Sequence, residues 1–509
     1  MKDFLNSWGL SLAVFLPLMG ALVMFVVPKA REQFHKTVAL GTSLVVAFIG
    51  ILLFANFDYD ATGTMQFVVD KSWIPIINSR YIVGMDGISL PLIALTVLVV
   101  PLCIIYSWNH FPEPRNPKAF LILILILQTG MIGSFVAQDL ILFFVFFEVV
   151  LLPMYFMIGV WGGEKRQYAS LKFFLYTLFG SALMIVSFLA LFFVTGAETF
   201  NMTELASLVR SNDVVRTTQI LIFGGMFMGF GIKVPMFPFH TWLPDAHTQA
   251  PTQGSVILAA VLLKLGTYGF VRIALPILPA GAHWWAPIIG GLACIGIIYG
   301  ALGCLAQTDM KRLIAFSSVA HMGYVMLGIA TLTDFGINAA IFGMVAHGLI
   351  TGMLFFIAGS VKERFHTLEI GRLGGLLKQA PHLGWILGFT AMASLGLPGL
   401  AGFWGEFPVI LAAYNPAPGL SVGLFRFYMF VAALGTVLAA GYLLWLFQRT
   451  AFGTPKEEFA HEHVHDVGTA EWIAWLPMLV LIVVLGFLPV LIFGMTSDAV
   501  QVLAQSLAG

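Results

Sequence analysis

Six ionisable side chains lie inside long apolar stretches of the sequence. They are two glutamates, two lysines and two histidines: Glu148, Lys233, Lys264, His321, His347 and Glu406. A charged group in the middle of a membrane helix costs about 2.5–3.5 kcal/mol, so the four Glu and Lys residues together cost on the order of 10 kcal/mol. That cost is comparable to the stability of a whole domain, which indicates that these residues have a function. Carboxylates, amines and imidazoles can hold and release protons, so we interpret the six as coupled titrating sites of a proton path.

A purely structural role is the main alternative for the charged groups. Two buried Glu–Lys pairs can fix helix packing, although desolvation makes a buried pair a poor source of stability. A lone histidine in a membrane helix is often just hydrogen-bonded to a neighbouring helix. A functional role for the two histidines is therefore favoured only in combination with the four charged residues. No two histidines share a helix face at i, i+4 within one apolar stretch, so we expect no metal site on this path.

Two further clusters of polar residues lie outside the six. We interpret the first cluster, near the end of the seventh apolar stretch, as gating or capping groups: His240, Asp245 and His247. We expect the second cluster to be a solvated loop rather than a metal site: His461, His463, His465 and Asp466.

The composition places these residues in a membrane protein. The chain has 509 residues, of which 59% are hydrophobic and 10% charged, and its mean hydropathy is +0.93. Soluble domains carry about 25% charged residues, so lipid must be the solvent for much of this surface. Lys plus Arg equals Asp plus Glu at 25 each, and this balance gives no sign of nucleic-acid binding. The three cysteines form no CxxC pair, and we expect no cofactor on this chain.

We predict an all-α polytopic fold with about fourteen transmembrane helices, since a crossing needs roughly 20 apolar residues. The predicted spans are 8–27, 37–57, 86–108, 118–136, 139–161, 171–195, 220–240, 253–275, 285–306, 311–333, 336–360, 382–414, 424–448 and 472–494. Sixteen Lys and Arg residues fall in loops on one side of these spans and seven on the other, leaving Lys233 and Lys264 inside spans. The more basic side is predicted to be cytoplasmic, which places both termini on the outer face.

Helix breakers interrupt the seventh and twelfth spans. Pro235 and Pro238 follow Lys233, and Pro398 and Gly399 precede Glu406. In transporters, paired broken helices in two repeats mark the ion path. Glu148 and His321 are 173 residues apart, and so are Lys233 and Glu406, which favours two inverted five-helix repeats.

Four regions follow from this reading. They are helices 1–3 (1–117), a first repeat of spans 4–8 (118–275), a second repeat of spans 9–13 (285–448), and a loop with helix 14 (449–509).

Two long motifs resemble a known family. The runs KVPMFPFHTWLPDAHTQAPTQGSVILAAVLLKLGTYG (233–269) and DMKRLIAFSSVAHMGYVMLG (309–328) are similar to signatures of the antiporter-like subunits of respiratory complex I. The resemblance covers nearly the whole chain. The family includes three paralogous membrane-arm chains, which differ in the ionisable residue of the twelfth span. With Glu406 at this position, the sequence resembles the chain that has a glutamate there, whereas the sister chains L and N have a lysine. We also expect no long lateral helix after the last span, as chain L would have.

The resemblance implies a role for each of the six residues. Glu148 and Lys233 form the pair at the input half-channel, and Lys264 relays the proton toward the centre. His321 and His347 continue the path, and Glu406 ends it at the output half-channel.

The resemblance also implies a non-redox, proton-translocating subunit of the bacterial cytoplasmic membrane. Its partners are then lipid, protons, internal water and other membrane-arm subunits, with sister subunits L and N on either side. Three alternatives stay open: a subunit of a multisubunit sodium/proton antiporter, a membrane subunit of a hydrogenase-type or formate-linked complex, and a non-conducting scaffold.

Overall fold

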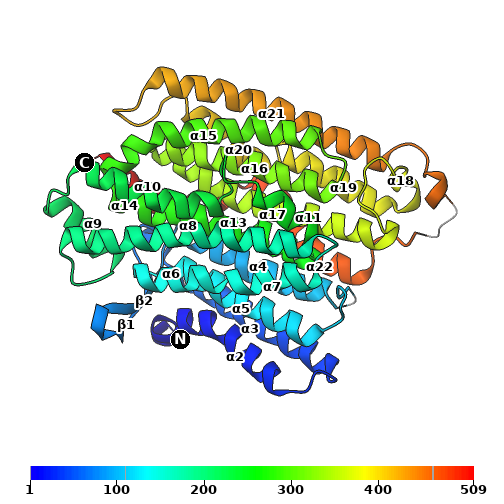
Figure 1. The fold of residues 1–509 in the computed structure, drawn as a ribbon, viewed down its shortest axis with the longest axis horizontal. Coiled ribbons are helices and arrows are strands. Elements are labelled where there is room, and N and C mark those ends of the chain that lie inside the picture. Colours follow the sequence, from blue (N-terminus) through cyan, green and yellow to red (C-terminus); the bar gives the residue numbers. More distant parts are fainter. Residues whose placement is uncertain (1, 109, 461–463, 509) are drawn as a thin grey trace.

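The computed structural model describes residues 2–108, 110–460 and 464–508 and shows a bundle of long helices that run roughly along one axis (Figure 1). His461 and His463 of the predicted loop cluster lie outside the described residues. Twelve of the described helices are long and apolar enough to cross a membrane. The multi-pass helical class predicted from the sequence is therefore confirmed, while the number of crossings and the inverted repeat stay predictions.

The first part of the chain forms the following elements: α1 (Lys2–Phe4), η1 (Leu5–Gly9), α2 (Leu10–Val26), α3 (Glu32–Asn56), η2 (Tyr59–Ala61), β1 (Gln66–Ile74), η3 (Pro75–Ile77), β2 (Ser79–Met85), α4 (Leu90–Tyr106), α5 (Pro117–Val136), α6 (Leu140–Val149), α7 (Leu151–Trp161), α8 (Arg166–Thr195), α9 (Met202–Ser211), α10 (Arg216–Lys233), α11 (Trp242–Gln249), α12 (Thr252–Ile257), η4 (Leu258–Leu262), α13 (Leu263–Gly269), η5 (Phe270–Ala274) and α14 (Leu275–Ile277). The second part forms α15 (Pro279–Leu305), α16 (Met310–Ala330), α17 (Asp334–Phe365), α18 (Leu376–Gln379), α19 (Pro381–Ser394), α20 (Ala401–Ala412), α21 (Val422–Ala451), η6 (Glu457–Phe459), α22 (Thr469–Phe487) and α23 (Val490–Ala508).

One β-hairpin, which was not predicted, interrupts the otherwise helical fold. β1 and β2 pair antiparallel, with Gln66 opposite Met85 and Ile74 opposite Ser79. The first strand reads QFVVDKSWI, rich in the β-branched and aromatic residues that favour strands. The hairpin lies at one end of the bundle, together with α9 and α14 (Figure 1).

The C-terminal region corrects the prediction of a single helix 14 over 472–494. α22 ends at Phe487 and α23 begins at Val490, because Pro489 has no N–H to continue the helix and Leu488 before it leaves the helical region. α23 then lies across the end of the bundle that carries the hairpin. Its Thr496 donates to Asn338 near the start of α17 at 2.6 Å, and its Leu507 carbonyl contacts His283 at the start of α15 at 3.1 Å.

The core sits around α17. The most apolar window of α17 is completely buried and those of α16 and the α12–α14 helix are 94% buried, whereas that of α3 is 28% buried. Side-chain caps fix where several inner helices begin: Asp139 for α6, Asp309 for α16 and Thr333 for α17. The inner helices therefore hold their side chains among protein neighbours, while the peripheral helices present apolar faces outward.

Candidate functional site

Lys264 lies at the middle of one continuous helix that runs from α12 to α14 and contains the two π-helical segments η4 and η5. Its Nζ donates to the carbonyl of Ala259 at 2.6 Å and contacts Nδ1 of His347 at 2.7 Å. In a π turn each N–H reaches back five residues instead of four, and this wider turn leaves carbonyl oxygens open to a side chain. The π segment η4 thus supplies a polar partner for a lysine that is fully buried.

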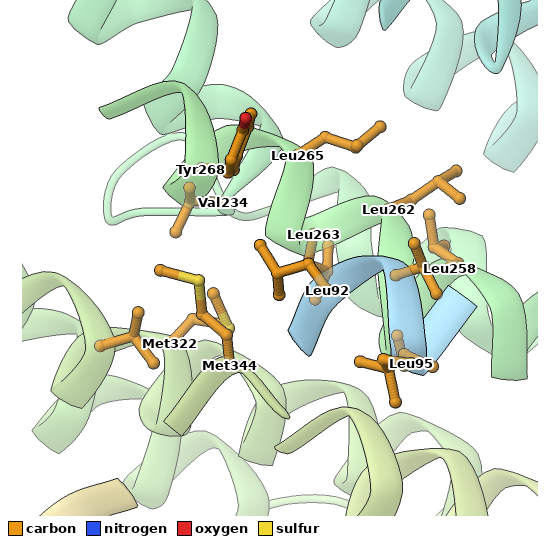
Figure 2. Close-up of a cluster of buried hydrophobic side chains, with 14 of the residues drawn as sticks. Leu92, Leu95, Val234, Leu258, Leu262, Leu263, Leu265, Tyr268, Met322 and Met344 are labelled. Atoms are coloured by element: carbon orange, nitrogen blue, oxygen red, sulfur yellow. The ribbon is translucent and has the colours of Figure 1, made fainter. Parts of the chain in front are cut away.

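An apolar shell surrounds this part of the helix. Figure 2 shows a cluster of buried apolar side chains on this helix and its neighbours, with these among the side chains labelled: Leu258, Leu262, Leu263 and Leu265, with Leu92 and Leu95 of α4, Met322 of α16 and Met344 of α17. A shell of this kind keeps bulk water away from the ammonium and strengthens its interactions with the few polar groups within reach.

A small cavity continues from His347 to the second histidine. It has a volume of about 20 Å³ and is lined by His321, His347 and Glu406, among others. The ring centroids of the two histidines are 5.9 Å apart, too far for direct hydrogen bonding. The cavity has room for about one water molecule, which needs roughly 10–15 Å³ of such volume. His347 Nε2, which has no partner among the described residues, lines the same region.

His321 and Glu406 form a buried pair at the far side of this cavity. Nδ1 of His321 lies 2.5 Å from Oε1 of Glu406, and its Nε2 faces the hydroxyls of Ser394 at 3.2 Å and Tyr442 at 3.3 Å. The four groups come from α16, α20, α19 and α21, so the pair joins four helices. Contacts on both ring nitrogens fix the orientation of the imidazole.

Glycines bring α17 and α20 close enough to place Glu406. A Cβ on Gly405 would lie 2.7 Å from the Cα of Gly343, so the backbones touch at this level. The predicted interruption of the twelfth span is present as the loop between α19 and α20, where Gly396 and Gly399 have φ of +81° and +92°. Only glycine adopts such angles without strain. The loop therefore positions α20 and its glutamate independently of α19.

The predicted break after Lys233 is also present. α10 ends there, and the backbone groups freed by the prolines find partners: the indole N–H of Trp242 donates to the carbonyl of Ile232 at 3.0 Å, and the N–H of Met236 to that of Gly231 at 2.9 Å. This is the internal compensation that a broken helix needs in lipid.

Glu148 and Lys233 are neighbours without a direct hydrogen bond. Glu148 accepts a hydrogen bond from Ser181 of α8 and interacts electrostatically with Lys233. The Lys233 ammonium lies 4.8 Å from the ring centroid of Phe147 and has no hydrogen-bond partner in the described part of the chain. A break between α6 and α7, not predicted from the sequence, lies at Val150, two residues after Glu148, where Pro153 cannot donate to the carbonyl four residues earlier.

The structure thus joins the six predicted residues into two hydrogen-bonded pairs, Lys264–His347 and His321–Glu406, and one looser pair. Sequence reasoning missed Ser181, Ser394 and Tyr442, which contact the glutamates and histidines from other helices. Short hydroxyl side chains are too common in membrane helices to single out, so the sequence carried no usable signal for them.

The structure places Asp245 and His247, at the end of the seventh span, in different surroundings. Asp245 pairs with Lys172 at 2.7 Å and lies 3.9 Å from Arg312. His247 is fully buried and stacks on Phe355, with the ring centroids 4.3 Å apart. Its role as a gate or cap stays a prediction.

Comparison with known proteins matches this arrangement to one family. The family described as NADH:quinone oxidoreductase/Mrp antiporter, TM, matches residues 137–434, and that described as NADH-ubiquinone oxidoreductase chain 4, amino terminus, matches residues 12–134. NADH-quinone oxidoreductase subunit M of Rhodobacter capsulatus is 41% identical over 98% of this chain and 96% of its own length. The chain belongs to the NADH-quinone oxidoreductase subunit M family. NADH-ubiquinone oxidoreductase chain 4 of Marchantia polymorpha is 38% identical over 94% of both chains.

Solved structures of membrane complexes contain chains with the same fold. A chain of respiratory complex I from Thermus thermophilus with bound NADH is similar with a TM-score of 0.87 at 28% identity, over 98% of this chain and all of the other. A chain of the Mrp complex from Dietzia sp. has a TM-score of 0.84 at 20% identity over 99% of this chain and all of the other, which shows a shared fold alone. The family resemblance predicted from the two motifs is confirmed.

Proposed function

We propose that this chain is a proton-translocating membrane-arm subunit of NADH-quinone oxidoreductase and that the six buried residues carry the protons. The observation that supports this most directly is the connected series from Lys264 through His347 and the cavity to His321 and Glu406. The oxidation of NADH and the reduction of quinone take place on other subunits, so the part of this chain is to convert energy without redox chemistry.

The steps from Lys264 to Glu406 have a geometry suited to proton transfer. The contact of 2.7 Å between Lys264 and His347 lies within the range of heavy-atom distances for direct transfer, about 2.6–3.2 Å. The cavity has room for one water molecule, which would carry the step from His347 to His321. At Glu406 the carboxylate stabilises a protonated His321 and can receive its proton.

The looser pair is suited to receive the driving signal. Two unit charges about 4 Å apart interact by roughly 4 kcal/mol at an effective dielectric constant near 20. Because Lys233 has no hydrogen bond to hold it among the described residues, a small movement of the helices beside α6 or α10 changes its distance to Glu148. In our proposal such a change alters the proton affinity of Lys233 and passes a proton toward Lys264.

The proposal includes an orientation and partners. The end of the bundle with α11 and the start of α16 faces the cytoplasm, and both termini face outward at the end with the hairpin, in a bacterial cytoplasmic membrane. The sister subunits L and N flank the chain, and the outward-facing apolar sides of α3 and α21 are suited to lipid or these neighbours.

The test uses the assembled complex in sodium-free proteoliposomes, with protons pumped per NADH as the readout. We expect Glu148→Gln and Lys233→Ala to lower this ratio sharply while the complex assembles and oxidises NADH. The control is Lys378→Ala, on the exposed surface of the short helix α18. Unchanged pumping in both variants contradicts the proton path and favours a scaffold, and pumping that requires sodium favours the antiporter alternative.

A further inference from the structure

A polar vestibule opens at the proposed cytoplasmic end, away from Glu148 and Lys233. It has a volume of about 500 Å³ and its wall is formed by the α4–α5 loop, the turn before α12, the start of α16 and the end of α17. Six titratable residues line it: His110, Glu113, Lys311, Lys362, Glu363 and His366. A hollow of this size holds many waters and brings bulk protons into contact with these groups.

A hydrogen-bonded pair stands at this vestibule. Nδ1 of His110 lies 2.7 Å from Glu363, which also accepts a hydrogen bond from the hydroxyl of Tyr106 at 3.2 Å. Glu471 lies nearby, and together with His110 and Glu363 it offers three ligand atoms within 4.8 Å of one another. Arg364 pairs with Glu471 at 2.7 Å and neutralises it, so this cluster is suited to protons rather than to a cation.

Lys311 lies deeper in the same vestibule. Its side chain is only 2% exposed, and its Nζ donates to the carbonyl of Ala250 at 2.7 Å. It forms no ion pair among the described residues, and the charged groups that face it are Lys362, Asp309 and Glu363. An ammonium has three donors, so two of its N–H groups remain available to water or to another relay group.

His247 connects Lys311 with the central path. Ala250, which holds Lys311, directly follows the helix that carries His247. His247 is completely buried, and neither of its ring nitrogens has a partner within the described ranges. It interacts electrostatically with two lysines, Lys311 of the vestibule and Lys264 of the central path. Buried polar groups are nearly always hydrogen-bonded, so a buried ring with two unpartnered nitrogens near two lysines is suited to act as a relay through water.

We propose that this vestibule is a second proton uptake route, through which protons reach Lys264 by way of Lys311 and His247 without crossing the Glu148–Lys233 pair. The proposal rests on the proposed function of the central path. Glu363 takes a proton from water and gives it to the neutral amine of Lys311. The resulting ammonium protonates one nitrogen of His247, and the other nitrogen releases its proton toward the neutral amine of Lys264. Each step breaks one bond to hydrogen and forms another, and no electrons move.

The decisive comparison is between two substitutions of Lys311 in the assembled complex. Lys311→Arg keeps the positive charge and the donor for the Ala250 carbonyl, but a guanidinium does not release its proton. A structural lysine is therefore rescued by arginine and a relay lysine is not. We expect Lys311→Arg and Lys311→Met both to lower the protons pumped per NADH, with the NADH oxidation rate and assembly as the check on folding.

A double variant separates the two uptake routes. If both feed Lys264, Glu148→Gln combined with Lys311→Met lowers pumping to the level of Lys264→Met, below either single variant. Wild-type pumping in Lys311→Arg, or a double variant no worse than Glu148→Gln alone, overturns the proposal while the central path stands. Full pumping in Lys264→Met overturns the central path itself. Lys378→Met serves as the matched surface control.

Discussion

The close approach of α17 and α20 makes Gly405→Ala a sensitive probe of the His321–Glu406 pair. The added Cβ would lie 2.7 Å from the Cα of Gly343, where ordinary contact begins at 3.4 Å, so the helices must separate by about 0.7 Å. If α20 moves as a unit away from both α17 and α16 by this amount, Glu406 and His321 go from 2.5 Å to about 3.2 Å apart. That is the outer limit of hydrogen bonding and well beyond the range of strong charge-assisted bonds, about 2.7–2.9 Å.

The expected loss follows from the strength of such a bond. A hydrogen bond to a charged group is worth about 1.5–3 kcal/mol, which corresponds to a tenfold to hundredfold change in the equilibrium between the paired and the separated side chains. We expect proton transfer through this chain to fall within that range. Overpacking also costs about 1–3 kcal/mol of stability, against a gain of about 0.5–1 kcal/mol from replacing a helical glycine. The complex should therefore unfold at a slightly lower temperature.

Gly441 provides the matched control, because a Cβ at this position in α21 meets no atom within 4 Å. Gly441→Ala should leave pumping unchanged and should not lower the unfolding temperature. Proton pumping per NADH in proteoliposomes and thermal unfolding of the purified complex measure both effects. If Gly405→Ala pumps as well as Gly441→Ala, the short His321–Glu406 contact is not needed for transport and the reasoning fails.

Two further predictions concern the helix break and the vestibule. Trp242→Phe removes the indole N–H that serves the Ile232 carbonyl and should cost about 1–3 kcal/mol of stability, seen as a lower unfolding temperature; the exposed Trp385→Phe is the control, and equal unfolding temperatures would show that the carbonyl finds another partner. Burial opposes the charged form of His110, but the hydrogen bond and charge of Glu363 outweigh it, so the pKa of His110 lies above its ordinary value. This stabilisation is complete below the ordinary pKa and is lost as the pH rises through the raised one. Thermal unfolding across about pH 6–8 should show the loss in the wild-type complex and not in Glu363→Gln, and parallel curves would contradict it.

Much of the fold follows from the distribution of apolar residues, because in lipid a backbone segment has few choices besides a helix. The hairpin was missed because it lies in a loop between spans, where only a modest preference of QFVVDKSWI for strands favoured it. The end of α22 was placed too late because Pro489 lies inside an apolar run, and hydropathy alone does not register a lost N–H.

The residues of the candidate site could be predicted from the sequence, but the contacts between them could not. Lys264 and Glu406 are conspicuous in the sequence because a charge in an apolar helix is rare. Lys264 contacts His347, which is 83 positions away, and only the packing of the α12–α14 helix against α17 brings the two together. Spacing along the chain carries no information about such contacts, and for the same reason the electrostatic interaction of His247 with Lys311 and Lys264 could not be predicted.

The π segment η4 has a consequence for how this helix can vary. An α-helical hydrogen bond reaches back four residues and a π-helical one reaches back five, so a π turn accommodates one extra residue within the helix. Deleting one residue from the segment Leu258–Leu262 would convert it into an ordinary α turn, in which the carbonyl oxygens are used by backbone N–H groups. Lys264 would then lose the free carbonyl to which its ammonium donates, although the lysine itself would still be present.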